Sequence, residues 1–328
     1  MVKYVVKRIV YLIFVFFILS ILLFILYQSI PGDPVKMMLD SRKAGTDPKT
    51  YQMMYEAMQK QLGLNRPLWI QYLSWMNRLL HGDYGYSSVY RMEVAKVVAL
   101  PLKNTICLNF IAFLCVFSIA IPVGILSAVK EHSSFDYVLQ IGTVTLYSLP
   151  TFIVALLIIY IFGVKLSWFP ISGMQTPGLM GSRRVLMLDR LYHMAMPLLV
   201  MIVSSVGGII RYIRSAMIEV LHMDYIKTAR AKGVNQRTLL YSHALRNAMI
   251  PVVTIVTSWF VAIFGGSVVV ESIFGFNGIG KVLYDALRQQ DYAVVLAMQM
   301  FYVVISLIGN LIMDLGYCLV DPRIKYSS

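Results

Sequence analysis

Charged side chains are scarce in this sequence. Asp, Glu, Lys and Arg together make up 14% of the 328 residues, whereas a soluble globular domain carries about a quarter. Hydrophobic residues make up 58%, and the mean hydropathy is +0.70. This deficit of charge excludes an ordinary soluble globule and indicates a chain that crosses a membrane several times.

Cysteine is rare too. Cys107, Cys115 and Cys318 each lie inside an apolar run, and no two have CxxC spacing. The sequence therefore predicts neither a disulfide framework nor a metal site, and the three cysteines are expected to be small buried hydrophobic residues.

The motifs of common enzymes are missing. There is no GxxxxGK[ST] phosphate loop, no HExxH and no GxSxG, and no pair of carboxylates falls within an apolar run. We expect a chain that is not an enzyme, has no catalytic residue, binds no cofactor and does not hydrolyse ATP itself.

Acidic residues are outnumbered, 16 against 29 basic ones, which gives a net charge of +13. Such a charge can indicate nucleic-acid binding, but no RNA-binding motif or basic recognition helix is present. Lys and Arg also gather on the cytoplasmic loops of membrane proteins, so membrane lipid is the expected neighbour and nucleic acid is not.

Long apolar runs dominate the remainder. The first is preceded by Lys3, Lys7 and Arg8, which places the N-terminus in the cytoplasm; it is too long for a signal peptide and no small-x-small cleavage site follows. The runs predict an all-α polytopic membrane protein with six transmembrane helices and both termini cytoplasmic. The predicted helices span residues 9–27, 105–129, 137–164, 195–210, 251–270 and 292–320.

The spans divide the chain into three parts. Residues 1–30 form the cytoplasmic N-terminus and first span, residues 31–104 a long external region, and residues 105–328 a five-helix core that contains a polar loop at 219–250. Four basic residues in the short external segment 165–194 run against the charge rule.

The external region contains helix signals. Asp47-Pro48 is typical of an N-cap followed by proline at the first helical position. Further on, apolar residues at helical spacing predict an amphipathic helix, which either lies at the membrane surface or packs on the outer ends of the spans. These residues are Trp69, Tyr72, Leu73, Met76 and Leu80.

A few residues near the spans invite functional readings. Pro150 could be a hinge or bend around a translocation path, or an ordinary packing kink. Glu271, at the outer end of the fifth run, could meet a peptide amino terminus or a cation, or be merely solvated or ion-paired. Asp314 could pair with Arg211 or Arg214.

Small residues in the fourth run, Gly207 and Gly208, are expected to allow close approach of another helix, and His193 is expected at the interface rather than on a metal.

A polar, basic island occupies residues 211–251. Asp224 is a candidate N-cap for a helix through Lys232, Gly233 suits a C′ position with positive φ, and Asn235 can cap a second helix running to Pro251. Two short helices joined at Gly233 would form a compact knuckle. Its small residues would permit close contact with another protein, and its leucines could fill a pocket there. On composition alone, an ordinary basic cytoplasmic loop remains the alternative.

The island resembles the cytoplasmic coupling loop, the "EAA" loop, of bacterial ABC-importer permeases in its peptide-transport variant. The stretch DYIKTARAKGVNQRTLLYSHALRNAMIPVV carries the likeness, although only Ala229, Gly233 and Leu245 fit the generic pattern. The downstream stretch GGSVVVESIFGFNGIGKVLYDAL and the closing DPR extend it over nearly the whole chain. The coupling residues implied are Asp224, Tyr225, Ala229, Arg230, Ala231, Gly233, His243, Ala244, Leu245, Arg246 and Asn247.

The resemblance implies a type I ABC importer permease fold in the bacterial inner membrane, forming half of a translocation pathway for oligopeptides or dipeptides. It also implies a second related permease, two ATPase subunits that carry ATP and Mg²⁺, and an extracytoplasmic substrate-binding protein. Nickel or a metal chelate is an alternative cargo. An ion-coupled secondary transporter without an ATPase is an alternative of another class, which would predict carboxylates embedded in the membrane.

Overall fold

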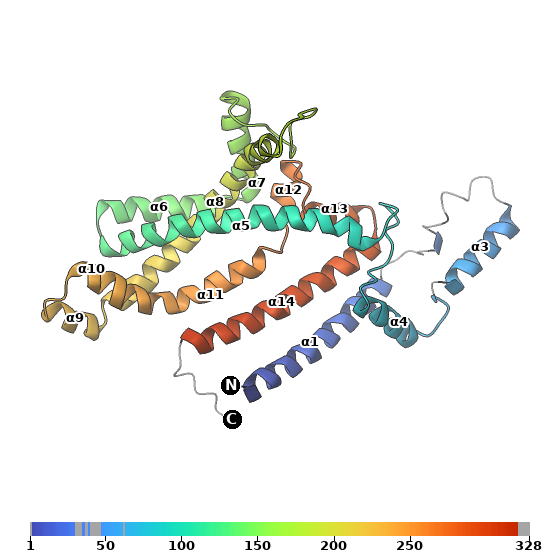
Figure 1. Cartoon of the computed structure of the whole chain (residues 1–328), viewed down its shortest axis with the longest axis horizontal. Helices are drawn as coiled ribbons and strands as arrows, with labels where there is room; N and C mark the ends of the chain where they lie inside the picture. The colour runs from blue at the N-terminus through green and yellow to red at the C-terminus, as the bar shows by residue number, and fades with distance from the viewer. Residues whose placement is uncertain (1, 30–34, 37–38, 40–46, 62, 321–328) are drawn as a thin grey trace. The chain divides into compact units, whose positions relative to one another are not determined.

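The chain is helical throughout the part that the structure describes. The computed structural model describes residues 2–29, 35–36, 39, 47–61 and 63–320 (Figure 1). Within these ranges there is no β-strand, only an isolated bridge between Tyr86 and Glu93. The predicted all-α class is therefore confirmed for the described residues.

Two compact units make up the fold. The first contains residues 1–99 and 283–304, and the second contains residues 100–282 and 305–328. The longer helices are α1 (Val2–Ser29), α3 (Pro48–Gln61), α4 (Leu68–Leu80), α5 (Val94–Val129), α6 (Ser134–Ser148), α7 (Thr151–Ile158), α8 (Arg183–Leu221), α9 (Asp224–Ala231), α11 (Arg246–Ala262), α12 (Val268–Ile273), α13 (Ile279–Arg288) and α14 (Tyr292–Val320). A three-residue helix, α10 (Gln236–Thr238), and two π-helical segments, Ile159–Lys165 and Leu239–Leu245, complete the set.

The first unit is built on α1. The amphipathic helix α4 packs one face on it, where the hydroxyls of Ser20 and Tyr72 lie 2.8 Å apart and the ring centroids of Phe24 and Tyr72 5.6 Å apart. The other face leaves Trp69 and Leu73 more than half exposed. One face of α4 is therefore packed on α1, and a position of the other face at the membrane surface stays a prediction. The expected start of α3 is confirmed, because the Tyr51 amide donates to the Asp47 carbonyl over 2.9 Å.

The second unit packs its helices around α8. This helix runs for 39 residues, far beyond the apolar run at 195–210 that predicted it. The part of α8 after residue 210 has buried Ile213, Ala216 and Met217 at helical spacing, with polar residues between them. A search for an uninterrupted apolar run therefore identifies only the middle of α8.

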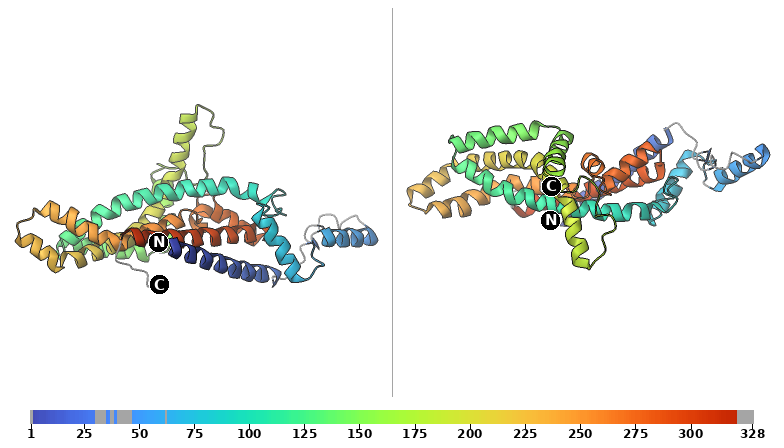
Figure 2. Two further views of the ribbon diagram at one scale, coloured as in Figure 1. Left: turned by 60° about the horizontal axis from the view of Figure 1, so that its bottom comes forward. Right: turned by 90° about the horizontal axis from the view of Figure 1, so that it is seen from above.

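The predicted third span is not one kinked helix. α6 and the α7 segment through Lys165 are bent by 101° at Leu149–Pro150, where both residues have extended ψ angles. Proline has no amide hydrogen and disfavours helical geometry in the residue before it, so the helix breaks there instead of bending. α6 lies along α8 (Figure 2).

Gly207 allows this close approach of α6 and α8, as expected. A Cβ at this position would lie 2.9 Å from the carbonyl oxygen of Thr143 on α6. At the neighbouring Gly208 the nearest atom would be a Tyr147 ring carbon at 3.5 Å, an ordinary contact. The close approach therefore depends on one of the two glycines.

A buried ion pair ties the same helices together. Asp136 on α6 is fully buried, and Arg214 on α8 donates to its two carboxylate oxygens from Nε and Nη2, each over 2.7 Å. Ser127 at the end of α5 donates a third bond over 2.5 Å. Arg214 therefore does not form the pair with Asp314 that the sequence suggested as one possibility, because Asp136, a charged residue at the start of an apolar run, binds its guanidinium.

Apolar length supports several membrane crossings. Four helices are long and apolar enough to span a membrane, at Val5–Ser29, Val94–Val129, Arg183–Leu221 and Tyr292–Asp314, and the bent α6–α7 pair would make a fifth. The chain is thus a multi-pass membrane protein. The expectation of buried cysteines is wrong for Cys107, which is exposed on this chain, while the side chain of Cys318 lies outside the described residues.

Candidate functional site

The polar island forms the expected knuckle. α9 ends in a Schellman motif: the Gly233 amide donates to the Arg230 carbonyl over 3.1 Å, and the Val234 amide to the Ala229 carbonyl over 3.2 Å. Gly233 has φ +78°, the left-handed conformation that glycine adopts without steric cost. The sequence prediction of a positive-φ C′ residue here is confirmed.

The start of α9 differs by one residue from the expectation. Met223, with extended backbone, is the N-cap, and Asp224 is the first helical residue. The Asp224 carboxylate accepts a bond from Lys227 Nζ over 2.9 Å, which lowers the pKa of that carboxyl. Its negative charge at the first turn also suits the helix dipole, so Asp224 favours the helix without capping it.

One face of the knuckle is buried in the body of the second unit. Ile226 is 1% exposed, and Leu239 and Ala244 are as deeply buried. They share a hydrophobic cluster with side chains of α5, α8 and α11. Because such a cluster is closely packed, a displacement of α9 would disturb its contacts with the helices that share the cluster.

The opposite face is open. Tyr225 is 45% exposed, and its hydroxyl accepts a bond over 3.0 Å from Nδ2 of Asn247 at the start of α11. Arg230, Ala231 and Lys232, at the end of α9, are exposed as well. A partner that docks on the knuckle would have the Tyr225 ring and these residues within its reach.

The predicted contact residues divide between the two faces. Ala229, Leu240 and Leu245 pack partly buried against the same cluster as Ala244, and Leu239 is a buried member of it. The sequence had suggested these three leucines for a partner's pocket. His243 lies in the π-helical segment Leu239–Leu245, and Arg246 is the first residue of α11. The side chains of both, and that of Arg237, lie outside the described part of the structure.

A second polar cluster surrounds Glu271, which is 1% exposed. Its Oε1 accepts from the Thr105 hydroxyl over 2.8 Å, and its Oε2 from the Lys281 amide at the start of α13 over 2.9 Å. Burial raises the pKa of the Glu271 carboxyl above its ordinary value, and these donors act against that rise. In this conformation Glu271 binds its own chain, not solvent.

Glycines let the chain close around this carboxylate. A Cβ on Gly278 would lie 2.3 Å from the Glu271 carboxyl carbon, and one on Gly266 would lie 2.1 Å from the Gly280 amide nitrogen. The segment between α11 and α13 is held further by Asn109 of α5, whose amide donates to the Gly265 carbonyl over 2.7 Å. The GFNGIG stretch therefore has its glycines where backbone and carboxylate meet.

Pro150 and His193 take structural positions. Pro150 is the N-cap of α7, whose buried side chains pack with those of α8 and α12. His193 is 6% exposed, with Nδ1 2.9 Å from the Asp189 carbonyl oxygen. The described residues contain no group of three His, Cys, Asp or Glu that could hold a metal ion.

Several of these anchoring residues escaped the sequence analysis. Thr105, Asn109 and Asp136 are single polar residues at the edge of apolar runs, and only their partners, distant in sequence, reveal them. The one sign of them in the sequence is their polarity within an apolar run, because a polar group within a membrane helix needs a partner.

Comparison with known proteins decides the family. Residues 120–326 match the protein family described as "binding-protein-dependent transport system inner membrane component". Residues 1–115 match the family that describes the N-terminal part of the same components. The chain belongs to this family. It is a membrane transport component of the ABC-importer permease type, as the resemblance implied.

The relatives of this permease include peptide transporters. It is 37% identical to the oligopeptide transport system permease protein AppB of Bacillus subtilis over 99% of this chain and 100% of that protein. It is 34% identical to the di/tripeptide permease DppB of Pseudomonas aeruginosa, over 99% of each, and 32% identical to the glutathione permease GsiC of Escherichia coli, over 99% and 100%.

A solved chain of the MetNI methionine ABC transporter, inward facing, is also similar. It matches 67% of the permease and 96% of its own length, at 17% identity and a TM-score of 0.48, below the level that establishes a common fold.

Proposed function

We propose that this permease forms half of the translocation pathway of an ATP-driven importer of oligopeptides or dipeptides. The observation that carries the proposal is the knuckle, whose inner face packs on α5, α8 and α11 while its outer face stays open. That arrangement suits an element that a bound protein displaces and that transmits the displacement to the membrane helices. The names of the relatives support a peptide cargo.

The partners of this machine are part of the proposal. A second homologous permease would complete the pathway, two ATPase subunits would bind ATP and Mg²⁺, and an extracytoplasmic binding protein would deliver the cargo. The outer face of the knuckle, which carries the exposed members of the eleven coupling residues identified from the sequence, would contact the ATPase, while Ala244 would act from the buried face. Closure of the ATPase pair would then move α9, and through Ile226 the ends of α5 and α8.

Six crossings with both termini in the cytoplasm belong to the same proposal. Four are long apolar helices, and the bent α6–α7 pair is the fifth. The sixth is α11, which has 17 residues but continues directly from the π-helical segment Leu239–Leu245. α11 alone rises about 26 Å, close to the hydrocarbon thickness of about 30 Å, so the knuckle itself stays outside the bilayer.

Site-specific photocrosslinking tests the docking face. A benzophenone amino acid replaces Tyr225 or, as control, Tyr284 of α13; each side chain is 45% exposed. We expect the probe at 225 to yield an adduct with a protein that carries a GxxxxGK[ST] phosphate loop, and the probe at 284 to yield none with such a protein. A reproducible absence of this adduct at 225 in native membranes would favour the ion-coupled transporter.

Uptake measurements test the cargo separately. Cells that lack the gene should lose import of a labelled dipeptide or oligopeptide and retain import of nickel, and a plasmid copy should restore the loss. Loss of nickel uptake alone would assign the metal cargo instead, and would leave the docking result unaffected.

A further inference from the structure

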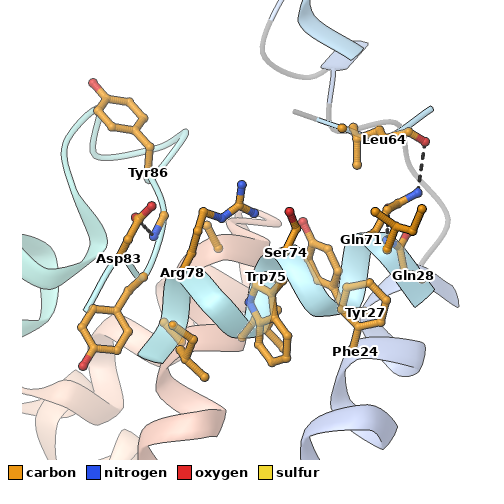
Figure 3. Close-up of a pocket in the computed structure, with 18 of the residues that line it drawn as sticks. Phe24, Tyr27, Gln28, Leu64, Gln71, Ser74, Trp75, Arg78, Asp83 and Tyr86 are labelled. Atoms are coloured by element: carbon orange, nitrogen blue, oxygen red, sulfur yellow. Dashed lines mark hydrogen bonds between the residues drawn. The ribbon is translucent and has the colours of Figure 1, made fainter. Parts of the chain in front are cut away.

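The first unit contains a cavity that the transport proposal does not use. It has a volume of about 220 Å³ and lies between the end of α1, one face of α4, the segment 83–86 and the start of α14 (Figure 3). On α4 the lining residues recur at the spacing of one helical face; they are Ile70, Gln71, Ser74, Trp75, Arg78 and Leu79.

The cavity lies where two spans meet the water. Its lining residues on α1, Phe24, Tyr27 and Gln28, belong to the last turns of that span, and those on α14, Ala293, Leu296 and Ala297, belong to the first turns of another. Its aromatic rings are the kind that concentrate at the headgroup level of a bilayer. The outer side of α1 next to it exposes more than half of Ile25 and Leu26, apolar surface suited to acyl chains.

Charges of both signs face this cavity. Arg66 and Arg78 contribute two cations, and Asp83 contributes a carboxylate whose Oδ1 accepts the Gly85 amide over 2.9 Å. Figure 3 shows Arg78 between Asp83 and Ser74. Among the described residues neither arginine side chain has an ion pair or a hydrogen bond, and Arg78 and Asp83 do not pair with each other.

Unpaired charges of opposite sign in one cavity suit a ligand that carries both. Guanidinium groups bind phosphate with charge-assisted, often bidentate hydrogen bonds. A carboxylate in the same cavity, whose lining also includes the rings of Trp75 and Tyr86, suits an ammonium group. The side-chain amide of Gln28 donates to that of Gln71 over 2.9 Å, and both groups belong to the polar lining of the cavity.

We propose that this cavity binds the headgroup of a phospholipid that carries a phosphate and a primary ammonium, of the phosphatidylethanolamine type. The phosphate lies on Arg78 and Arg66, the ammonium lies toward Asp83, and the acyl chains follow the exposed apolar side of α1. The site is independent of the peptide cargo and of the ATPase contact.

Lipid titration of the purified full-length chain, with the subunits that co-purify, tests the proposal. The delipidated protein receives phosphatidylethanolamine, phosphatidylcholine or phosphatidylglycerol with identical acyl chains, and bound lipid is counted by native mass spectrometry. We expect phosphatidylethanolamine to bind more tightly than phosphatidylcholine, whose quaternary ammonium has no proton to donate.

Three variants separate the parts of the site. Arg78→Gln should weaken all three lipids about tenfold, the size expected for loss of a charge-assisted hydrogen bond. Asp83→Asn should weaken phosphatidylethanolamine alone, because Asn retains the acceptor for Gly85. Arg288→Gln on α13, an exposed arginine of the same unit outside the cavity, should change nothing.

Equal binding of phosphatidylethanolamine to Arg78→Gln and Arg288→Gln would overturn the site. Free phosphoethanolamine that competes as tightly as the intact lipid would overturn the lipid assignment and leave a soluble anion as the ligand. Displacement of the lipid by a dipeptide, dependent on Arg78, would assign the cavity to peptide instead. Because Arg78 and Asp83 are exposed, unchanged unfolding temperatures should show that the variants fold.

Discussion

At the scale of single residues, a few positions depend on one specific property, such as a backbone conformation or a hydroxyl group. Gly233 is one: its backbone requires positive φ, yet a Cβ there would meet nothing within 4 Å. Any effect of substitution must therefore come from backbone strain alone, not from a clash.

A pair of Gly233 variants tests this. Gly233→Val should destabilise the knuckle by about 1–3 kcal/mol, because a β-branched residue resists left-handed geometry, and should uncouple ATP hydrolysis from uptake. Gly233→Asn should retain most uptake, since Asn tolerates that conformation. The measurement is uptake against ATPase activity in membrane vesicles with equal amounts of inserted protein. Full uptake by the valine variant would contradict the coupling role.

Thr105 is a second such residue, since its hydroxyl donates to Glu271 and accepts the Ile279 amide over 2.9 Å. Thr105→Val keeps the shape and loses both bonds, and should cost about 1–3 kcal/mol for each buried group left unpaired. Hydrogen exchange at Ile279 and Lys281 should then be faster. Thr105→Ser, which keeps the hydroxyl, should exchange like the native chain; equally fast exchange in both variants would show that the hydroxyl is not the anchor.

At the scale of elements, helix packing is decided by which small residue faces which neighbour. Gly207 and Gly208 are adjacent in sequence, but only Gly207 meets the backbone of α6. The sequence indicated close approach near this pair, and could not assign it to one of the two, because the rotation of α8 is fixed by side chains along its whole length.

Alanine at each glycine distinguishes them. Gly207→Ala places a methyl group 2.9 Å from the Thr143 carbonyl oxygen, and should destabilise the chain by about 1–3 kcal/mol as overpacked helices separate. Gly208→Ala should be neutral or slightly stabilising, because alanine favours helix by about 1 kcal/mol over glycine. Thermal unfolding in detergent measures both, and a stable Gly207→Ala would show that α6 is free to move away.

The elements also show what could be read from the sequence. The run at 292–320 predicted α14 to the residue, and Asp47-Pro48 and Gly233 marked a helix start and a helix end correctly, because these signals are local. The full length of α8, the 101° break after α6 and the Asp136–Arg214 pair could not be read. They depend on contacts between residues far apart in the chain.

The candidate site divides in the same way. The bends of the knuckle were predicted because they follow from Gly233 and its neighbours. Which side chains face inward was not, since Ala244 and Leu239 are buried by α5, α8 and α11, which no local pattern of residues 224–247 contains.

At the scale of the whole molecule, orientation across the membrane decides which faces partners can reach. In a variant with Cys107, Cys115 and Cys318 replaced by serine, a cysteine at His81 should react with an impermeant thiol reagent from outside intact cells. A cysteine at Gln236 should react only after permeabilisation. Both positions are exposed on the chain, so access depends only on the side of the membrane. The reverse pattern would invert the topology.

The corner at Leu149–Pro150 has a consequence for solvation. The Leu149 amide donates to the Leu146 carbonyl over 3.4 Å, but other carbonyl oxygens in the last turn of a helix that ends in a 101° corner have no amide of a following turn. Lipid tails offer them no donor. These oxygens need water or another polypeptide beside them, so hydrocarbon cannot surround the corner. Of the six proposed crossings, this one therefore marks where the lipid must give way to a wet or protein-lined interior.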